Sequence, residues 1–301
     1  MFENLLQKNS KEKIREWLLP DPKGRQLAAG LYLIATPIGN LGDMSVRALD
    51  TLAAVDVVFC EDTRVSGKLL SYFGLKKALA VYNDHSDEKI RVNILERIQK
   101  GEAVALVSDA GMPLVSDPGY KLVEFLRGKD APVTSVPGAN APLTALQVSG
   151  LPSDRFSFIG FLPAKSGVRQ GLLEEWKNVP GTLIAFETAP RLLGALADIG
   201  KIMGGERRIV VTRELTKMYE EVRAGFAPEL IAHYEEAGLP KGEIVLVIES
   251  PQAKRYSEDD VEVMIKDALQ TMSTKDAAAY VAEHTGRAKK ELYDLALKVS
   301  S

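Results

Sequence analysis

The sequence contains little of what builds disulfide-linked or membrane proteins. It has a single cysteine, Cys60, which excludes an intramolecular disulfide and is typical of a reducing compartment. No apolar stretch reaches the roughly 20 residues that span a bilayer, and residues 1–25 are charged, without the apolar core of a secretory signal. We therefore expect a cytoplasmic protein that does not enter a membrane.

Several common catalytic signatures are also absent. The chain has neither the phosphate-binding GxxxxGK[ST] motif nor the dinucleotide-binding GxGxxG motif, and it lacks the GxSxG turn of serine hydrolases. HExxH and CxxC do not occur, and the three histidines, His85, His233 and His284, are far apart in the sequence. We predict no metal site. His85, in a polar loop, could transfer protons, although an exposed loop histidine is the simpler interpretation.

The bulk composition is that of a globular protein with more than one core. The chain has 301 residues, of which 46% are hydrophobic and 26% are charged, and this length allows two cores and a small appendage. The net charge of −3 argues against non-specific binding to nucleic acid. Any contact with RNA must therefore come from local segments.

Strand-like and helical segments alternate along most of the chain, which predicts α/β architecture, with a parallel sheet covered on both faces in its first part. Apolar runs of strand length occur at 31–35, 57–60, 103–107 and 133–136, and then at 156–160, 182–186, 209–212 and 244–248. Helical segments at 261–272, 277–283 and 289–299 form a tail with a helix-turn-helix outline. We predict an N-terminal extension (1–28), two α/β domains (29–141 and 142–251) and a helical tail (252–301).

Turn-forming residues gather where strands of the first domain end. Three such loops occupy residues 36–42, 108–119 and 137–142, and all are rich in glycine, proline, aspartate or asparagine. In an open parallel sheet, ligands bind beyond the carboxyl ends of the strands, where glycine lets the backbone approach the ligand. A single loop of this kind is usually an ordinary turn, but three together predict one cleft for a small molecule.

These loops and several later segments resemble the ribosomal RNA small subunit methyltransferase I family of the tetrapyrrole methylase superfamily. The motifs that carry the resemblance are TPIGNL (36–41), EDTR (61–64), SDAGMP (108–113), SDPG (116–119), GLPSDRF (150–156), GFLPAK (160–165), ELTK (214–217) and KGE (241–243). They follow the family's order from about residue 30 to residue 250. Met112 and the Ala139–Asn140 pair depart from the small residues expected at their positions.

The resemblance implies two α/β domains with S-adenosylmethionine in the cleft between them. It also implies 2′-O-methylation of a decoding-centre cytidine in 16S ribosomal RNA of the small subunit, and a homodimer. By the same pattern, the residues that line the cofactor are expected to be Thr36, Pro37, Gly39, Asp109, Ala110, Gly111, Pro113, Ala139 and Asn140. Asp109 would accept hydrogen bonds from the cofactor, or else shape its own loop as an Asx-turn.

Two charged clusters are candidates for catalysis. Glu61, Asp62 and Arg64 follow a strand of the first domain, and Glu214 and Lys217 follow a strand of the second. Each cluster could position the substrate or remove the proton of the ribose hydroxyl. An internal Asp62–Arg64 ion pair and a solvated Lys217 are the structural alternatives. The sequence leaves the base open among Glu61, Asp62, Glu214 and Lys217.

Basic residues of the second domain and the tail are candidates for contact with RNA phosphates. They are Lys165, Arg169, Arg191, Arg207 and Arg208, with Arg287, Lys289 and Lys290 in the tail. Two other functions stay open. One is a precorrin-type tetrapyrrole C-methyltransferase on the same fold, and the other is an RNA-binding module without catalysis.

Overall fold

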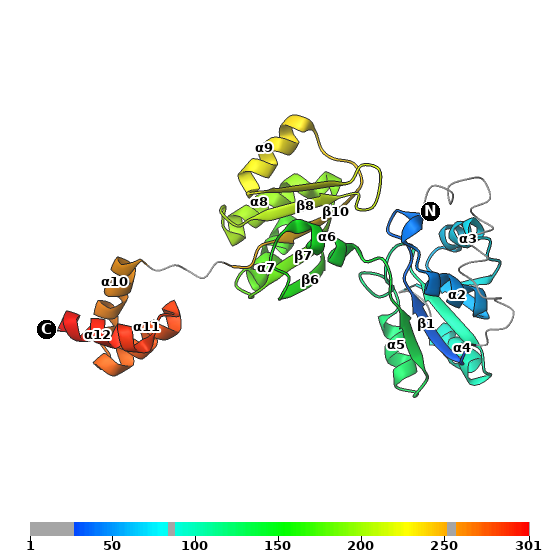
Figure 1. Ribbon diagram of the computed structural model, residues 1–301, viewed down its shortest axis with the longest axis horizontal. Helices are drawn as coiled ribbons and strands as arrows, with labels where there is room; N and C mark the ends of the chain where they lie inside the picture. The colour runs from blue at the N-terminus through cyan, green and yellow to red at the C-terminus, as the bar shows by residue number, and fades with distance from the viewer. Residues whose placement is uncertain (1–26, 84–87, 252–256, 301) are drawn as a thin grey trace, which may run out of the picture. The chain divides into compact units, whose positions relative to one another are not determined.

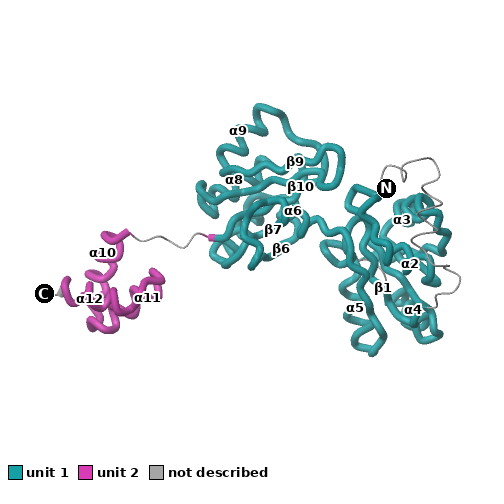
Figure 2. The backbone as a smooth tube through the Cα atoms, in the orientation of Figure 1, with its two compact units in different colours: residues 1–250 teal, residues 251–301 magenta. Residues whose placement is uncertain are grey.

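The computed structural model describes residues 27–83, 88–251 and 257–300. Most of the predicted extension (1–28) and His85 lie outside these residues. The chain divides into two compact units, Met1–Ser250 and Pro251–Ser301 (Figure 2). The first unit contains two sheets with their helices, and the second contains three helices (Figure 1). The boundaries at residues 28 and 141 remain predictions.

The first sheet is entirely parallel, as predicted. Its strands are β1 (Gly30–Ile34), β2 (Val57–Cys60), β3 (Ala78–Val81), β4 (Ala103–Val107) and β5 (Val133–Val136), in the order β3-β2-β4-β1-β5. The helical segments are η2 (Leu41–Asp43), α2 (Val46–Ala54), α3 (Thr63–Tyr72), α4 (Glu88–Gln99) and α5 (Tyr120–Arg127).

The central strand β4 shows why this sheet needs helices on both faces. All five of its residues are buried. Ala105 and Val107 pack in one hydrophobic cluster with residues of α2 and α3, whereas Val104 and Leu106 pack in another with residues of α4 and α5. Because side chains alternate along a strand, a continuous apolar run requires two cores, one on each face.

The second sheet is mixed. Its strands are β6 (Phe156–Phe161), β7 (Thr182–Thr188), β8 (Ile209–Arg213), β9 (Glu221–Gly225) and β10 (Glu243–Ile248), in the order β6-β7-β10-β8-β9. Strand β10 is antiparallel to both β7 and β8. The helical segments are α6 (Ala141–Ser149), α7 (Ser166–Trp176), η3 (Ala189–Arg191), α8 (Leu192–Met203) and α9 (Ala227–Ala237).

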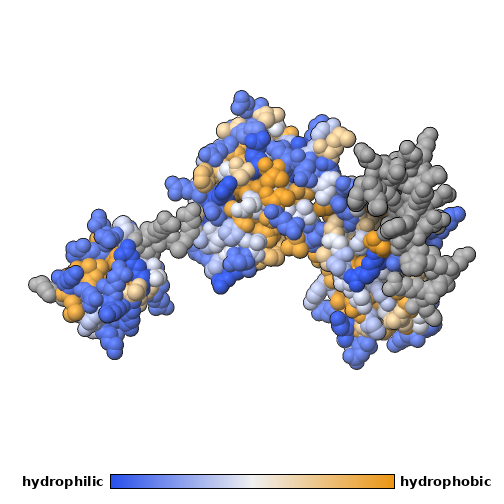
Figure 3. Space-filling model, in the orientation of Figure 1, coloured by the Kyte–Doolittle hydropathy of each residue, from blue (hydrophilic) through white to orange (hydrophobic). Residues whose placement is uncertain are grey.

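The two faces of the second sheet have different cores. Helices α7, α8 and α9 pack against one face in a large cluster that includes Leu183, Leu246 and Val211. The opposite face packs against α6 and also against Ile38, which comes from the loop after β1 of the first sheet. In the view of Figure 3, hydrophobic residues gather over the part of the molecule that carries the second sheet.

The second unit is a three-helix bundle of α10 (Glu258–Leu269), α11 (Thr274–Thr285) and α12 (Lys289–Ser300). Val261, Ile265, Val281 and Leu292 are almost fully buried in its separate core. Ser257 caps α10 and Ser273 caps α11, each by accepting a hydrogen bond from a backbone amide in the first turn. No helix in the described parts of the chain is long and apolar enough to cross a bilayer.

The sequence patterns missed two strands and one α-helix. Strands β3 and β9 both lie at sheet edges and have partly exposed residues. Strand β9 has charged residues at alternate positions and no continuous apolar run, whereas β3 is a short apolar run that the predicted strands did not include. Residues 137–142 were predicted as a turn, but helix α6 begins at Ala141 within them. Pro142 is compatible with the first turn of this helix, because the amides there have no partner within the helix and the missing N–H of proline costs no hydrogen bond.

Truncating a central side chain of the second sheet tests this packing. Leu246 is fully buried in β10 between β7 and β8, so Leu246→Ala should lower the free energy of unfolding by about 2–5 kcal/mol. Val168 on α7 is 59% exposed, and Val168→Ala should change the free energy of unfolding by less than about 0.5 kcal/mol. Urea denaturation measures both, and equal losses would contradict this assignment of the core.

Candidate functional site

The loops after β1 and β4 lie side by side at the carboxyl edge of the first sheet. The two strands are parallel neighbours, with Ile34 paired to Val107. The chain leaves β1 towards α2 on one face and leaves β4 towards α5 on the other. A crevice forms where neighbouring connections diverge in this way, and such crevices bind ligands in open α/β sheets.

A reciprocal pair of backbone hydrogen bonds joins the two loops across this crevice. The amide of Thr36 donates to the carbonyl of Gly111 at 2.9 Å, and the amide of Gly111 donates to the carbonyl of Thr36 at 3.1 Å. The buried Thr36 hydroxyl also donates to the Ser108 carbonyl at 3.1 Å. Gly111 has a φ of +82°, and a Cβ there would lie 3.3 Å from Cγ2 of Ile38. A side chain at this position would therefore be strained and crowded.

The first cavity, of about 330 Å³, opens beside this bridge. Ala110, Gly111 and Asn140 line it from the loops of the first sheet and the start of α6. The second sheet contributes the apolar and polar side chains of Phe161, Phe186, Thr188, Glu243 and Ile244. Asn140 caps α6, because its side-chain oxygen accepts a hydrogen bond from the Leu143 amide at 2.9 Å. The volume lies within the usual range of small-molecule sites, about 300–1,000 Å³.

A second cavity, of about 510 Å³, adjoins the first at Ile38 and Ala110. Both residues line both cavities, and so does Glu243. Of the predicted site residues, Pro37, Gly39, Asp109 and Lys217 line the second cavity. Helix α3 supplies an apolar and basic wall of Val65, Lys68, Leu69 and Tyr72. The three shared residues make the two cavities neighbours, as two molecules that react with each other must be.

The other predicted residues do not line the two cavities. Thr36 and Pro113 are buried, and Ala139 packs against the cluster that holds Ile38. Glu61, Asp62, Arg64 and Glu214 line neither of the two cavities.

The sequence patterns missed the residues that the second sheet contributes. Because β10 runs antiparallel to β7, Glu243 at its start pairs with Thr188 at the end of β7, and Ile244 pairs with Glu187. Thr188 follows the predicted apolar strand at 182–186, and a polar residue in that position could have indicated a site residue. The direction of β10 could not be inferred from a run of apolar residues alone.

Asp62 and Arg64 form a local ion pair, as the structural alternative proposed. The Asp62 carboxylate accepts from the Arg64 guanidinium at 2.6 Å and from the Arg64 amide at 2.8 Å, and it caps α3. These bonds lower the pKa of Asp62 to about 2. A carboxylate with so low a pKa is a poor proton acceptor.

Asp109 lies beside this pair in a different electrostatic environment. Its Oδ1 accepts a hydrogen bond from the Asp62 amide at 3.4 Å. Burial raises the pKa of Asp109, the hydrogen bond from the Asp62 amide lowers it, and the negative charge of Asp62 raises it further; the net direction is upward. Asp109 is therefore a better proton acceptor than Asp62.

Lys217 is held by two carboxylates. Its Nζ lies 2.8 Å from Oε1 of Glu214 and 3.1 Å from Oε2 of Glu243. Burial lowers the pKa of Lys217, but the bonds to the two carboxylates outweigh this and raise it. The bond from Lys217 lowers the pKa of Glu214. Lys217 is thus a fixed ammonium group at neutral pH, and Glu214 a fixed carboxylate.

Two glycines make room for this ion pair. A Cβ on Gly39 would lie 2.4 Å from Cγ of Lys217, and a Cβ on Gly242 would lie 2.4 Å from the carboxyl carbon of Glu214. Contacts this short do not occur, so these side chains would have to move. Gly39 belongs to the first sheet's loop, and the close approach therefore brings that loop against the second domain.

Comparison with known proteins shows the family to which the chain belongs. A family model described as Tetrapyrrole (Corrin/Porphyrin) Methylases matches residues 30–231, and one described as RsmI C-terminal HTH domain matches residues 257–300. The chain belongs to the tetrapyrrole methylase family. Its α/β fold and its helix-turn-helix tail were both predicted and are confirmed.

Relatives in this methylase family align over nearly the whole chain. Proteins named ribosomal RNA small subunit methyltransferase I are 46% identical in Mesorhizobium japonicum, 50% in Erythrobacter litoralis and 43% in Escherichia coli O157:H7. The alignments cover 89%, 93% and 89% of this chain, and 92%, 99% and 94% of the relatives. The family resemblance inferred from the motifs is therefore confirmed.

Solved structures of other tetrapyrrole methylases share the fold. Uroporphyrin-III C-methyltransferase from Thermus thermophilus has a TM-score of 0.51 at 21% identity, over 73% of this chain and 94% of that chain. The complex of such an enzyme with S-adenosylhomocysteine has a TM-score of 0.51 at 19% identity, over 73% of this chain and 97% of that chain. The family consists of S-adenosylmethionine-dependent methyltransferases, which confirms the predicted cofactor.

The first cavity fits the cofactor of this methylase family. Phe161 and Phe186 form an apolar, aromatic wall suited to an adenine ring, and Asn140 and Thr188 supply polar groups. The N-terminus of α6, at Ala141 and Pro142, also lines the cavity, and the partial positive charge of a helix N-terminus favours a carboxylate such as that of methionine.

The predicted basic set of the second domain is partly structural, which corrects one expectation. Arg169 is 4% exposed and pairs with Asp198 at 2.5 Å. Arg191 pairs with the buried Glu187 at 2.7 Å, and Arg207 donates to the Lys177 carbonyl at 2.8 Å. A charged group removed from water is unfavourable unless it is paired, and these guanidinium groups have partners within the protein.

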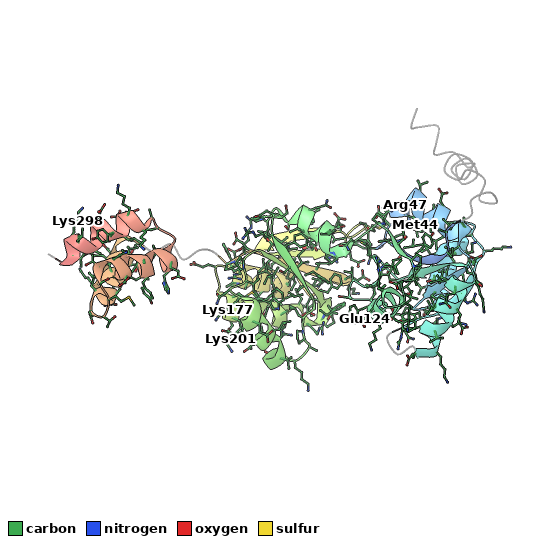
Figure 4. All side chains as sticks on the ribbon, turned by 90° about the horizontal axis from the view of Figure 1, so that it is seen from below. Met44, Arg47, Glu124, Lys177, Lys201 and Lys298 are labelled. Atoms are coloured by element: carbon green, nitrogen blue, oxygen red, sulfur yellow. The ribbon has the colours of Figure 1, made fainter. Side chains whose placement is uncertain are left out.

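Exposed cations remain elsewhere in the domain. Lys165 and Arg208 are exposed. Figure 4 labels Lys177, which pairs with Glu174, and the exposed Lys201, which donates to Gln170.

Substitution of Gly242 tests the role of the ion pair. Gly242 has a φ of +106°, and its Cβ would displace Glu214, so Gly242→Ala should lower methyl transfer about 10-fold or more by releasing Lys217. Gly101 has a φ of +93° with no atom within 4 Å of the added Cβ. Gly101→Ala therefore carries similar backbone strain without the collision, and it should keep full activity. Similar rates for the two variants would contradict a role for the pair.

Proposed function

We propose that this protein transfers a methyl group from S-adenosylmethionine to the ribose 2′-oxygen of a decoding-centre cytidine in small-subunit ribosomal RNA. The observation that carries the proposal is the pair of cavities with a shared wall at Ile38 and Ala110. The names of the relatives support ribosomal RNA as the substrate. We expect the reaction to occur in the cytoplasm.

The cofactor would bind in the first cavity and the acceptor ribose in the second. When bound, S-adenosylmethionine supplies an electrophilic methyl group on a positively charged sulfur. The protein must hold the 2′-oxygen in line with that group, and fixed geometry of this kind can contribute about 7–11 kcal/mol to lowering the barrier. Asp109 and Ala110 reach the second cavity from the same loop whose Gly111 lines the first. This loop would therefore set the distance between the two molecules.

Asp109 is the group that would accept the proton of the ribose hydroxyl. Among the carboxylates compared above, Asp62 has a pKa of about 2 and is bound to Arg64, and the pKa of Glu214 is lowered by Lys217. The pKa of Asp109 is raised, and its side chain lines the second cavity. Lys217 lines the same cavity, but Glu214 and Glu243 neutralise its charge, so it would position the acceptor by donating a hydrogen bond rather than by attracting the phosphate backbone.

The precorrin-type alternative rests on the shared fold alone. The uroporphyrin-III C-methyltransferase is 21% identical to this chain, whereas the relatives described above are 43–50% identical and carry a ribosomal RNA name. An RNA-binding module without catalysis would not need two adjacent cavities.

The pH dependence of single-turnover methyl transfer tests Asp109. The rate should rise as the pH increases through the raised pKa of Asp109, because only its ionised form accepts a proton, and it should level off above. Asp109→Asn should remove this rise and slow transfer by about 10²–10⁴-fold. Asp62→Asn, which can still cap α3, should keep the rise. If Asp109→Asn instead abolishes cofactor binding in calorimetry, Asp109 is a cofactor ligand rather than the base.

The substrate is tested by mapping ribose methylation in small-subunit RNA from cells with and without the protein. One decoding-centre cytidine should lose its 2′-O-methyl group in the deletion strain, and purified protein should restore it on isolated small subunits. Transfer of labelled methyl into a precorrin and not into RNA would overturn the proposal.

Deleting residues 255–301 should weaken binding to RNA and spare cofactor affinity, because the helical tail is a separate compact unit.

A further inference from the structure

Two neighbouring side chains near the second cavity are unusually exposed. Met218 is 88% exposed and Tyr219 is 68% exposed, the two highest values for large hydrophobic side chains among the described residues. Single exposed apolar residues are common, but an adjacent pair beside a functional cavity indicates a surface that contacts another molecule.

The loop that carries them has a shape set by internal bonds and backbone strain. It joins β8 to β9 and contains Glu214 and Thr216, both with positive φ (49° and 66°). The Thr216 amide donates to the Glu220 carboxylate at 2.6 Å, and the Glu220 amide donates to the Lys217 carbonyl at 3.2 Å. Strained residues persist where surrounding contacts enforce them, commonly at functional sites. The exposed pair is therefore presented on a pre-organised tip.

The tip lies between two hollows. Lys217, immediately before Met218, lines the second cavity. Tyr219 lines a separate groove of about 670 Å³, whose charged lining residues are Arg213, Lys241, Glu214 and Glu221. An extended polymer whose reacting unit enters the second cavity would thus meet the tip and then a groove of mixed charge.

We propose that Tyr219, supported by Met218, stacks on an unpaired RNA base next to the methylated nucleotide and holds that nucleotide apart from its neighbours. This inference rests on the proposed ribosomal RNA substrate. A ribose within folded RNA reaches an enclosed site only if neighbouring bases unstack, and an aromatic side chain replaces the lost stacking. Apolar side chains inserted between bases also keep them apart. Loss of one aromatic stacking partner weakens binding by about 5- to 150-fold.

The first experiment compares three variants on isolated small subunits. Tyr219→Ala should raise KM for the subunits by about 5-fold or more, while kcat at saturation and the calorimetric affinity for S-adenosylmethionine change little. Tyr219→Phe, which keeps the ring, should restore the wild-type KM. Tyr120 is 67% exposed and lines none of the three hollows. Tyr120→Ala is the matched control and should behave as wild type. An unchanged KM for Tyr219→Ala would overturn the inference.

The second experiment detects stacking directly. In Tyr219→Trp, binding of a short single-stranded RNA that contains the acceptor cytidine should quench the added indole emission, whereas Tyr120→Trp should show no change. No quenching at Tyr219→Trp would overturn the stacking contact. The stacking contact would also be overturned if Tyr219→Ala converted a dimer to a monomer in sedimentation without altering RNA affinity. In that case the tip would be a surface between two copies of the chain.

Wild-type protein is assayed in parallel, so that the two proposals fail separately. Failure of wild-type protein to methylate small-subunit RNA overturns the proposed function. Normal methylation by both wild type and Tyr219→Ala, with equal KM, overturns only the role of Tyr219.

Discussion

The reciprocal hydrogen bonds between Thr36 and Gly111 are the contact on which the rest of the site depends. They join two loops that leave neighbouring strands towards opposite faces of the sheet, where backbone polar groups would otherwise lack partners. Once joined, the loops place Ile38 in the hydrophobic cluster of the second sheet. A contact within the first domain thereby seats the second domain, and Ile38 and Ala110 border both cavities.

Charged residues near these cavities are paired before any substrate arrives. Asp62 is bound to Arg64, and Lys217 is bound to Glu214 and Glu243. Pairing lowers the pKa values of Asp62 and Glu214 and raises those of Arg64 and Lys217. Asp109 differs because burial outweighs the hydrogen bond from the Asp62 amide. The site therefore combines charged groups that are fixed by their partners with a carboxylate, Asp109, whose affinity for a proton is increased.

Contact with RNA must be reconciled with a net charge of −3. The structure leaves fewer cations for contact with RNA, because Arg169 and Arg191 neutralise carboxylates within the protein. Affinity would then depend on a few exposed cations, on the helical unit and on shape, such as the rigid tip with Met218 and Tyr219. Recognition of this kind suits RNA, whose unstacked bases offer flat apolar faces.

Local patterns in the sequence determined most of the secondary structure and the loops that line the first cavity. Apolar runs predicted eight of the strands, and turn residues at strand ends indicated these loops, because both signals depend on neighbours in the chain. The individual residues Ala110, Gly111 and Asn140 were expected from the family resemblance. The tertiary structure alone decided that β10 runs antiparallel and brings Glu243 beside Thr188. It also decided that Arg169 meets Asp198 and is buried. Strand direction and ion pairing join residues distant in sequence, and no local pattern specifies them.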